Sequence, residues 1–68
     1  MIRFHIANMN CGGCAKGVAA VMKEAMPRAE PRFDLGRREV ALDAPDAEAQ
    51  QLLSALGRDG WEARLIPN

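Results

Sequence analysis

Met9-Asn10-Cys11-Gly12-Gly13-Cys14 decides both the fold and the chemistry of this chain, because it contains both cysteines and separates two segments of different periodicity. Apolar residues alternate with other residues over 2–7, which predicts a half-buried strand before the motif. Apolar residues recur at helical spacing over 15–26, which predicts an amphipathic helix after it. The two thiols are therefore expected at a strand-to-helix turn. The unpaired N–H groups and the positive dipole end of a helix start both favour the thiolate form.

Gly12 and Gly13 leave no side chain between the two sulfurs, and we expect them to allow positive φ angles and to expose the loop amides. Two small cysteines and two glycines are also ordinary turn residues, yet C-x-x-C at such a junction is typical of metal and redox sites. A disulfide between Cys11 and Cys14 would close a tiny loop and remove little entropy from the unfolded chain. The pair is therefore expected to serve chemistry rather than stability.

The composition predicts one small domain and excludes several function classes. A chain of 68 residues allows a single domain, 1–68, with a small core. The formal net charge is zero, no basic run occurs and only three residues are aromatic, which argues against nucleic-acid binding. No apolar segment approaches the ~20 residues that span a bilayer, and the N-terminus has no signal-peptide pattern. We expect a cytoplasmic protein with reduced thiols and no direct membrane insertion.

The remaining segments predict two more strands, a second helix and a last strand. Pro31 cannot donate to a ladder, so the strand that follows it is expected at a sheet edge. The expected elements are a strand at 32–34, a turn at 35–37, a strand at 39–42, a helix that starts at Pro45 and Asp46 and ends between Gly57 and Gly60, and a strand at 61–66. This order predicts an α+β fold, a ferredoxin-like βαββαβ sandwich in which a four-stranded antiparallel sheet carries two helices on one face.

Two motifs resemble those of a known family. Residues 9–14 form M-x-C-x-x-C between the first strand and the first helix, and residues 56–63 resemble the pattern L-x-x-x-G-[aromatic]-x-A. With its length and element order, the chain resembles the heavy-metal-associated domain family, which includes small copper chaperones and the soluble metal-binding domains of P-type metal ATPases. The chain departs from the family pattern at Asn8, where Gly is frequent, at Asn10, where copper members often have Thr or Ser and zinc members Asp, and at Trp61.

The resemblance implies that Cys11 and Cys14 bind a heavy-metal ion and pass it to a partner by thiolate exchange. Two thiolates suit a soft, low-coordinate ion such as Cu(I), whereas Zn(II) usually takes four ligands. His5 lies on the outward set of its strand and is expected to point elsewhere, and Asn10 offers only a neutral oxygen. Cu(I) is therefore the expected ion, while Ag(I), Hg(II) and Zn(II) stay open. Cys11 lies earlier in the loop and is expected to be the more mobile ligand.

Three further positions have two interpretations each. Met9 is either a third, thioether ligand or, as the resemblance implies, a core residue beneath the loop, whereas Met22 and Met26 fit packing or surface positions. Lys16 either offsets the negative charge of a bis-thiolate Cu(I) centre or is a solvated lysine. The resemblance places the loop of Trp61 beside the cysteines, where its ring would exclude water and its N–H would approach a thiolate. The alternative is that Trp61 packs on the sheet as a large apolar residue.

The charge is unevenly distributed along the chain, which is either an ordinary solvated surface or a feature that orients a partner. Residues 1–28 carry four Lys and Arg against one Glu, a net charge of +3, and residues 39–68 carry six acids against two Arg, a net charge of −4. We expect the partner to present an acidic face to Lys16 and Lys23. The resemblance implies that this partner is the soluble metal-binding domain of a P-type metal ATPase. The chain itself is expected to be a monomer, or a dimer bridged by metal.

Other function classes stay as alternatives. A detoxifying or regulatory module would bind Zn(II), Hg(II) or Ag(I) at the same two cysteines without transferring the ion. A thiol-disulfide oxidoreductase also uses C-x-x-C at a helix start, but this chain is shorter than a thioredoxin fold and its element order differs. No nucleophile-base constellation indicates an ordinary enzyme.

Overall fold

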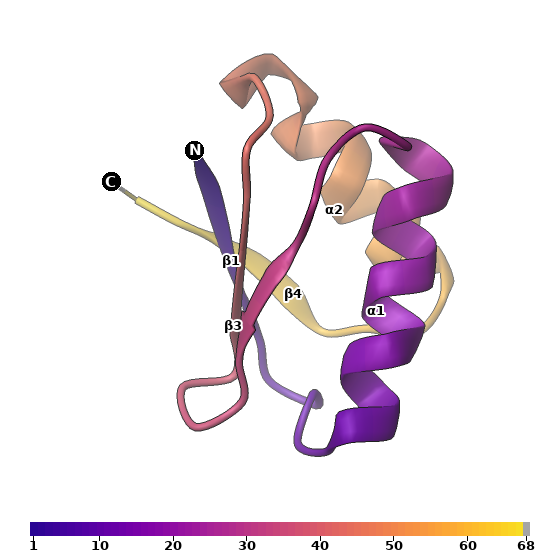
Figure 1. The fold of residues 1–68 in the computed structure, drawn as a ribbon, viewed down its shortest axis with the longest axis vertical. Helices are drawn as coiled ribbons and strands as arrows, with labels where there is room; N and C mark the ends of the chain where they lie inside the picture. Colours follow the sequence, from indigo (N-terminus) through magenta and orange to yellow (C-terminus); the bar gives the residue numbers. More distant parts are fainter. Residues whose placement is uncertain (68) are drawn as a thin grey trace.

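The computed structural model describes residues 1–67 and has the predicted order of elements. In chain order these are β1 (Ile2–Ile6), α1 (Gly12–Ala25), β2 (Arg32–Asp34), β3 (Glu39–Leu42), a short 3-10 helix η1 (Asp46–Glu48), α2 (Ala49–Arg58) and β4 (Ala63–Ile66). The ferredoxin-like βαββαβ fold is confirmed, and both helices cover one face of the sheet (Figure 1). Neither helix within residues 1–67 has the length and apolar character needed to cross a bilayer.

The four strands form one antiparallel sheet in the order β2-β3-β1-β4. β1 pairs with β3 on one side and with β4 on the other, so the strand that leads into the cysteine motif is hydrogen-bonded along both edges. β2 is an edge strand, which confirms the prediction from Pro31. The motif therefore continues from one of the two inner strands of the sheet.

Alternation along β1 divides its side chains between the core and the outer face of the sheet. Phe4 is fully buried beneath the helices, and its neighbour His5 belongs to the opposite face because successive side chains of a strand alternate. His5 lies opposite Glu39 of β3 and Arg64 of β4. The prediction that His5 points away from the helix-covered face is confirmed.

The core fills the space between the sheet and the helices, and it extends beneath the cysteine motif. The largest fully buried side chains are Phe4, Ile6, Met9, Met22, Leu42, Leu52, Leu56, Val18 and Val40. Met9 is in this cluster with 0% of its surface exposed, so the residue that opens the motif is anchored in the core. The apolar stripes predicted on both helices are confirmed as the faces that bury against the sheet.

The helix expected to start at Pro45 and Asp46 begins as the 3-10 helix η1 and continues as α2 from Ala49. Helix α1 and strand β4 also start at residues other than those expected. Helix α1 begins at Gly12, three residues before the expected start, because Cys11 acts as its N-cap. β4 begins at Ala63, two residues later than expected, and the backbone N–H of the preceding Glu62 donates to the side chain of Asn8 rather than to a neighbouring strand. Both differences arise from side chains that bind backbone groups, which periodicity alone does not predict.

The expectation of positive φ angles at Gly12 and Gly13 is wrong. Both glycines lie in the first turn of α1, and within residues 1–67 the positive φ angles belong to Gly60 (90°) and Arg38 (57°). The left-handed conformation costs a non-glycine residue about 1–2 kcal/mol. The Arg38 Nη1 donates a hydrogen bond to the carbonyl oxygen of Ala7 at 3.0 Å, so the turn between β2 and β3 contacts the segment just before the motif.

The packing of α2 predicts a large cost for one truncation. Leu56 has 0% of its surface exposed, so Leu56→Ala should lower the free energy of unfolding by about 2–5 kcal/mol through lost burial and the cavity left behind. Leu65→Ala is the matched control, because Leu65 is 42% exposed and its truncation should cost only about 0.5 kcal/mol. Urea unfolding followed by circular dichroism measures both. Equal losses for the two variants would contradict this description of the core.

Candidate metal centre

The two cysteines occupy the N-cap and the third residue of helix α1. Cys11 has extended backbone angles (φ −152°, ψ 166°), and its Sγ accepts the backbone N–H of Cys14 at 3.3 Å. Its carbonyl oxygen accepts the N–H of Ala15 at 3.1 Å and so begins the helical hydrogen bonding. A thiol thus takes the role that Ser, Thr, Asp or Asn usually has at this position. The helix start places both sulfurs at the positive end of the helix dipole.

The two sulfur atoms lie 2.8 Å apart, and both thiols are free. Cys11 is exposed, whereas Cys14 is half-buried and packs against the core. The Cys14 thiol also donates to the Oδ1 of Asn10 at 3.8 Å. The structure therefore brings three of the predicted site residues together, with one sulfur open to solvent and the other supported by packing.

The surroundings of Cys14 favour its ionised form. The hydrogen bond with the Cys11 side chain is the main cause that lowers the pKa of the Cys14 thiol below its ordinary value. Backbone hydrogen bonds from residues 10, 11 and 14 lower the pKa further, and partial desolvation opposes them. A thiolate is the form that binds metals and attacks disulfides, so the helix start prepares Cys14 for either chemistry.

The first turn of α1 is open around the sulfurs. A Cβ atom at Gly12 would meet nothing within 4 Å, and one at Gly13 would meet only the Cys11 Sγ, at 3.9 Å. Lys16 is exposed one half-turn further along the helix. Within residues 1–67, no group of three or more His, Cys, Asp or Glu side chains is arranged to hold a metal ion. The candidate site thus offers two sulfurs and free access from solvent.

The core interpretation of the motif methionine is confirmed. Met9 has 0% of its surface exposed, and its backbone N–H donates to the carbonyl oxygen of Ile6 at 3.0 Å, which turns the chain at the end of β1. Met22 is also fully buried, and Met26 is half-buried against the same cluster. All three methionines therefore pack in or against the core, and Met9 fixes the position from which the cysteine segment starts.

Trp61 lies against helix α1, but its N–H is engaged elsewhere than expected. The indole Nε1 donates to the Oδ2 of Asp59 at 3.0 Å, so the expected contact between this N–H and a thiolate is absent. The Asp59 carboxylate is a charged acceptor, and hydrogen bonds to charged acceptors are stronger than those to neutral groups. The ring packs so closely on Gly17 that a Cβ atom there would lie 3.1 Å from the Trp61 Cζ2. The exclusion of water from the metal by this ring stays a prediction.

Asn8 is a structural residue of the site that sequence reasoning noted only as a departure from a family pattern. Its Nδ2 donates to the carbonyl oxygen of Gly60 at 3.0 Å, and its Oδ1 accepts the backbone N–H of Glu62 at 2.9 Å. The partners lie 52 and 54 residues away in the chain. The one signal of this role in the sequence is that position 8, where the family often has Gly, holds a residue with both a donor and an acceptor. No periodicity predicts such a contact.

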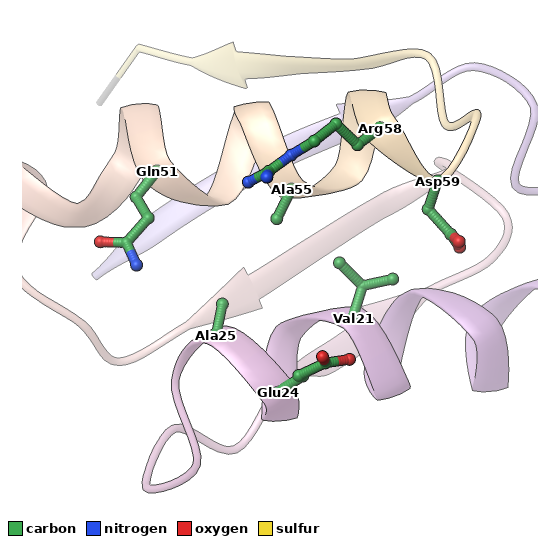
Figure 2. Close-up of a pocket in the computed structure, with 7 residues that line it drawn as sticks. All are labelled: Val21, Glu24, Ala25, Gln51, Ala55, Arg58 and Asp59. Carbon is green, nitrogen blue, oxygen red and sulfur yellow. The ribbon is translucent and has the colours of Figure 1, made fainter.

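A hollow of about 400 Å³ lies away from the cysteines, between α1 and α2 (Figure 2). Its lining residues are Val21, Glu24, Ala25, Gln51, Ala55, Arg58 and Asp59. Acidic and basic side chains both line it, and neither cysteine does. The candidate metal centre is therefore an exposed helix start and not a pocket.

Comparison with solved structures gives several full-length matches. A gold-binding protein is 32% identical, with 97% of this chain and 100% of that chain covered and a TM-score of 0.88. The copper chaperone Atx1 from Synechocystis PCC6803 is 22% identical, with 94% and 100% covered and a TM-score of 0.84. The N-terminal domain of ZntA in its Zn(II) form is 20% identical, with 94% and 88% covered and a TM-score of 0.80. No protein-family model and no curated protein sequence matches the chain.

The pKa of Cys14 gives a testable pH dependence. Because the folded state lowers this pKa, the thiolate stabilises the fold above the pKa of the unfolded thiol, and this contribution is lost as the pH falls through the folded pKa. Cys11→Ala removes the main cause, so the ionisation midpoint of Cys14 should rise. Thiolate absorbance of the reduced protein measures the midpoint, with Lys23→Ala as a control on the same helix. An unchanged midpoint in Cys11→Ala would refute the assigned cause.

Proposed function

Because this chain belongs to the heavy-metal-associated domain family, we propose that it binds one soft metal ion, Cu(I) above all, through Cys11 and Cys14 and transfers it to a partner. The observation that carries the proposal is the pair of free sulfurs, 2.8 Å apart at an exposed helix start. The 32% identity with a gold-binding protein over nearly the whole chain supports metal binding and trafficking as the broader function.

The number of donors favours Cu(I) over Zn(II). Zn(II) is almost always four-coordinate in proteins, whereas thiolate ligands select soft ions such as Cu(I). Residues 1–67 provide no group of three or more His, Cys, Asp or Glu for such a shell, and His5 belongs to the outer face of the sheet. A dithiolate therefore matches an ion that is content with two sulfurs. Ag(I) and Hg(II) have related preferences and are the competitors to be tested.

Gold is a second candidate ion, because the structure with 32% identity is that of a gold-binding protein. The same argument from softness and low coordination number applies to it. Competition between Cu(I) and a gold(I) salt for the reduced protein separates the two ions. In this alternative, the chain serves as a gold or heavy-metal module without transfer, and the site residues are unchanged.

Metal loading requires the sulfurs to move apart. With metal–sulfur bonds of about 2.3 Å, two sulfurs lie about 3.8 Å apart at a tetrahedral angle and about 4.6 Å apart in a linear arrangement. The observed separation is 2.8 Å. Cys14 is supported by the core, whereas Cys11 is exposed and its Sγ is held only through Cys14, by the 3.3 Å hydrogen bond from the backbone N–H and the 2.8 Å contact between the two sulfurs. Cys11 is therefore the ligand that rotates, in agreement with its assignment as the mobile one.

The same asymmetry supports transfer by ligand exchange. Both thiols release their protons when they bind Cu(I). The centre formed by two thiolates and one Cu(I) then carries one net negative charge. The positive end of α1 stabilises this negative charge, and the positive charge of the exposed Lys16 stabilises it further. A thiolate of the partner would approach from the open side at Gly12 and bond to the ion, after which Cys11 leaves; a second thiolate of the partner then replaces Cys14 in the same way. The ion is passed on without release to water.

The ligand assignment predicts one Cu(I) per chain. Cys11→Ser and Cys14→Ser should each remove tight binding, because a neutral hydroxyl is a poor ligand for a soft ion. Met9→Leu is the matched control: it conserves volume in the core and should keep both the fold and the Cu(I) affinity. An anaerobic competition titration with a chromophoric Cu(I) chelator measures the affinities. Full affinity in Cys11→Ser, or its loss in Met9→Leu, would show that the ligand set is wrong.

Docking on an acidic partner predicts a charge effect on transfer. We propose that the partner is the soluble metal-binding domain of a P-type metal ATPase and that it faces the exposed Lys16 and Lys23 of α1. The double variant Lys16→Glu and Lys23→Glu should slow Cu(I) transfer at low salt while leaving Cu(I) affinity intact.

The double variant Arg3→Glu and Arg64→Glu is the matched charge-reversal control. Both residues are exposed and belong to the outer face of the sheet, away from α1. Stopped-flow transfer to such an acidic domain, at low and high salt, measures the rates. Equal rates for the wild type and the two double variants at low salt would refute the docking face.

A further inference from the structure

The side chain of Asn8 binds the backbone on both sides of Trp61. Its Nδ2 donates to the carbonyl oxygen of Gly60 at 3.0 Å, and its Oδ1 accepts the N–H of Glu62 at 2.9 Å. A third hydrogen bond, from the N–H of Ala7 to the carbonyl oxygen of Glu62 at 3.0 Å, continues the pairing between β1 and β4 up to this point. The side-chain carboxamide of Asn8 therefore extends the hydrogen bonding between β1 and β4 beyond the strands and fixes the backbone of Trp61.

The side chain of Trp61 is fixed as well. Its backbone N–H donates to the carbonyl oxygen of Leu56 at 3.0 Å, and its indole N–H donates to Asp59 at 3.0 Å. The six-membered part of the ring then lies on Gly17 of α1, where a Cβ atom would be 3.1 Å from Cζ2 and 3.9 Å from Cη2. A contact of 3.1 Å is tighter than most contacts of a Cβ atom, so a side chain at residue 17 would require the ring to move by a few tenths of an ångström, whereas glycine lets it pack in its present place.

These contacts bracket the metal motif. Asn8 precedes Cys11 by three residues, and Gly17 follows Cys14 by three residues, close to one helical turn. We propose that residues 59–62 hold both ends of the cysteine segment through these contacts with Asn8 and Gly17, an arrangement that we call the clasp. Asn8, Gly17 and Trp61 are then positioning residues for metal binding. This inference rests on the proposed function, because it concerns the same two sulfurs.

The clasp acts by restricting which atoms move when the ion enters. The sulfurs must separate from 2.8 Å, and the backbone around them is held by buried Met9, by Asn8 and by the ring on Gly17. Rotation of the exposed Cys11 side chain is then the only motion needed. Opening the clasp adds backbone freedom that binding must remove, which weakens affinity and speeds release.

Two single variants open the clasp from opposite ends. Asn8→Ala removes both hydrogen bonds to the backbone around Trp61, and Gly17→Ala forces the ring to shift by a few tenths of an ångström. Each should weaken Cu(I) affinity by about tenfold, which is the lower end of the losses in affinity that follow when a residue supporting a metal ligand is changed. Each should also change the Trp61 fluorescence of the metal-free protein. Gly57→Ala is the matched control, because Gly57 is also in a helix and a Cβ atom there would meet nothing within 4 Å. It should leave the Cu(I) affinity unchanged.

A rescue separates positioning from stability. The smaller ring of Trp61→Phe makes room beside residue 17, so Gly17→Ala should have less than about a twofold effect on affinity in that background. Urea unfolding of each variant gives the folded fraction, and affinities are compared at equal folded protein. The proposal is overturned if Asn8→Ala and Gly17→Ala keep the wild-type Cu(I) affinity, or if Gly17→Ala has the same effect with Trp61 and with Phe at position 61.

Amide hydrogen exchange of the metal-free protein tests the clasp independently of the ion. Exchange at the hydrogen-bonded amides of Met9 and Cys14, which donate to the Ile6 carbonyl oxygen and to the Cys11 Sγ, should become about tenfold faster in Asn8→Ala than in the wild type, because the segment loses one of its anchors. Unchanged exchange would overturn the clasp even if wild-type protein binds Cu(I) tightly. Absence of Cu(I) binding by the wild type together with faster exchange in Asn8→Ala would instead refute the proposed function and leave the clasp supported.

Discussion

The hydrogen bond from the backbone N–H of Cys14 to the Sγ of Cys11 is the interaction on which the site depends. It makes the Cys11 thiol the N-cap of α1, so that starting the helix and assembling the two sulfurs are one event. The hydrogen bond with the Cys11 thiol, and after it backbone hydrogen bonds, lower the pKa of Cys14 and favour its thiolate. The positive end of the helix dipole favours the same form. The Cys11 sulfur therefore has two roles: it closes the first turn of α1, and it is the ligand proposed to leave the metal ion first during transfer.

The surrounding structure divides the site into a fixed part and a mobile part. Met9 is buried beneath the segment, and Cys14 packs against the core, which holds the backbone and one sulfur. Cys11 is exposed beside two glycines that add no steric barrier. An ion held this way is bound by a rigid frame and released through one side chain. Such an arrangement suits a protein that must bind a metal tightly and still exchange it with a partner.

The sequence predicts the element order, the edge position of β2 and the outward direction of His5, because these follow from alternation, helical spacing and proline chemistry. The buried position of Met9 is implied by the family resemblance alone. The sequence does not predict that α1 begins at Gly12, since cysteine is an unusual N-cap and glycine a poor helix former. Nor does it predict the contacts of Asn8 with the backbone around Trp61, since they join residues more than 50 positions apart. Side-chain hydrogen bonds to distant backbone leave no periodic pattern in a sequence.

X-ray absorption spectroscopy of the Cu(I)-loaded, reduced protein counts the atoms bound to the ion, and it therefore tests whether Cys11 and Cys14 are its two ligands. A centre made of these two thiolates predicts two sulfur neighbours per copper at a single distance and no nitrogen or oxygen neighbour, with the signal lost in Cys14→Ser. A third sulfur in the monomeric protein would contradict the core position of Met9, and a nitrogen neighbour would contradict the outward position of His5. Either result would refute a centre made only of Cys11 and Cys14.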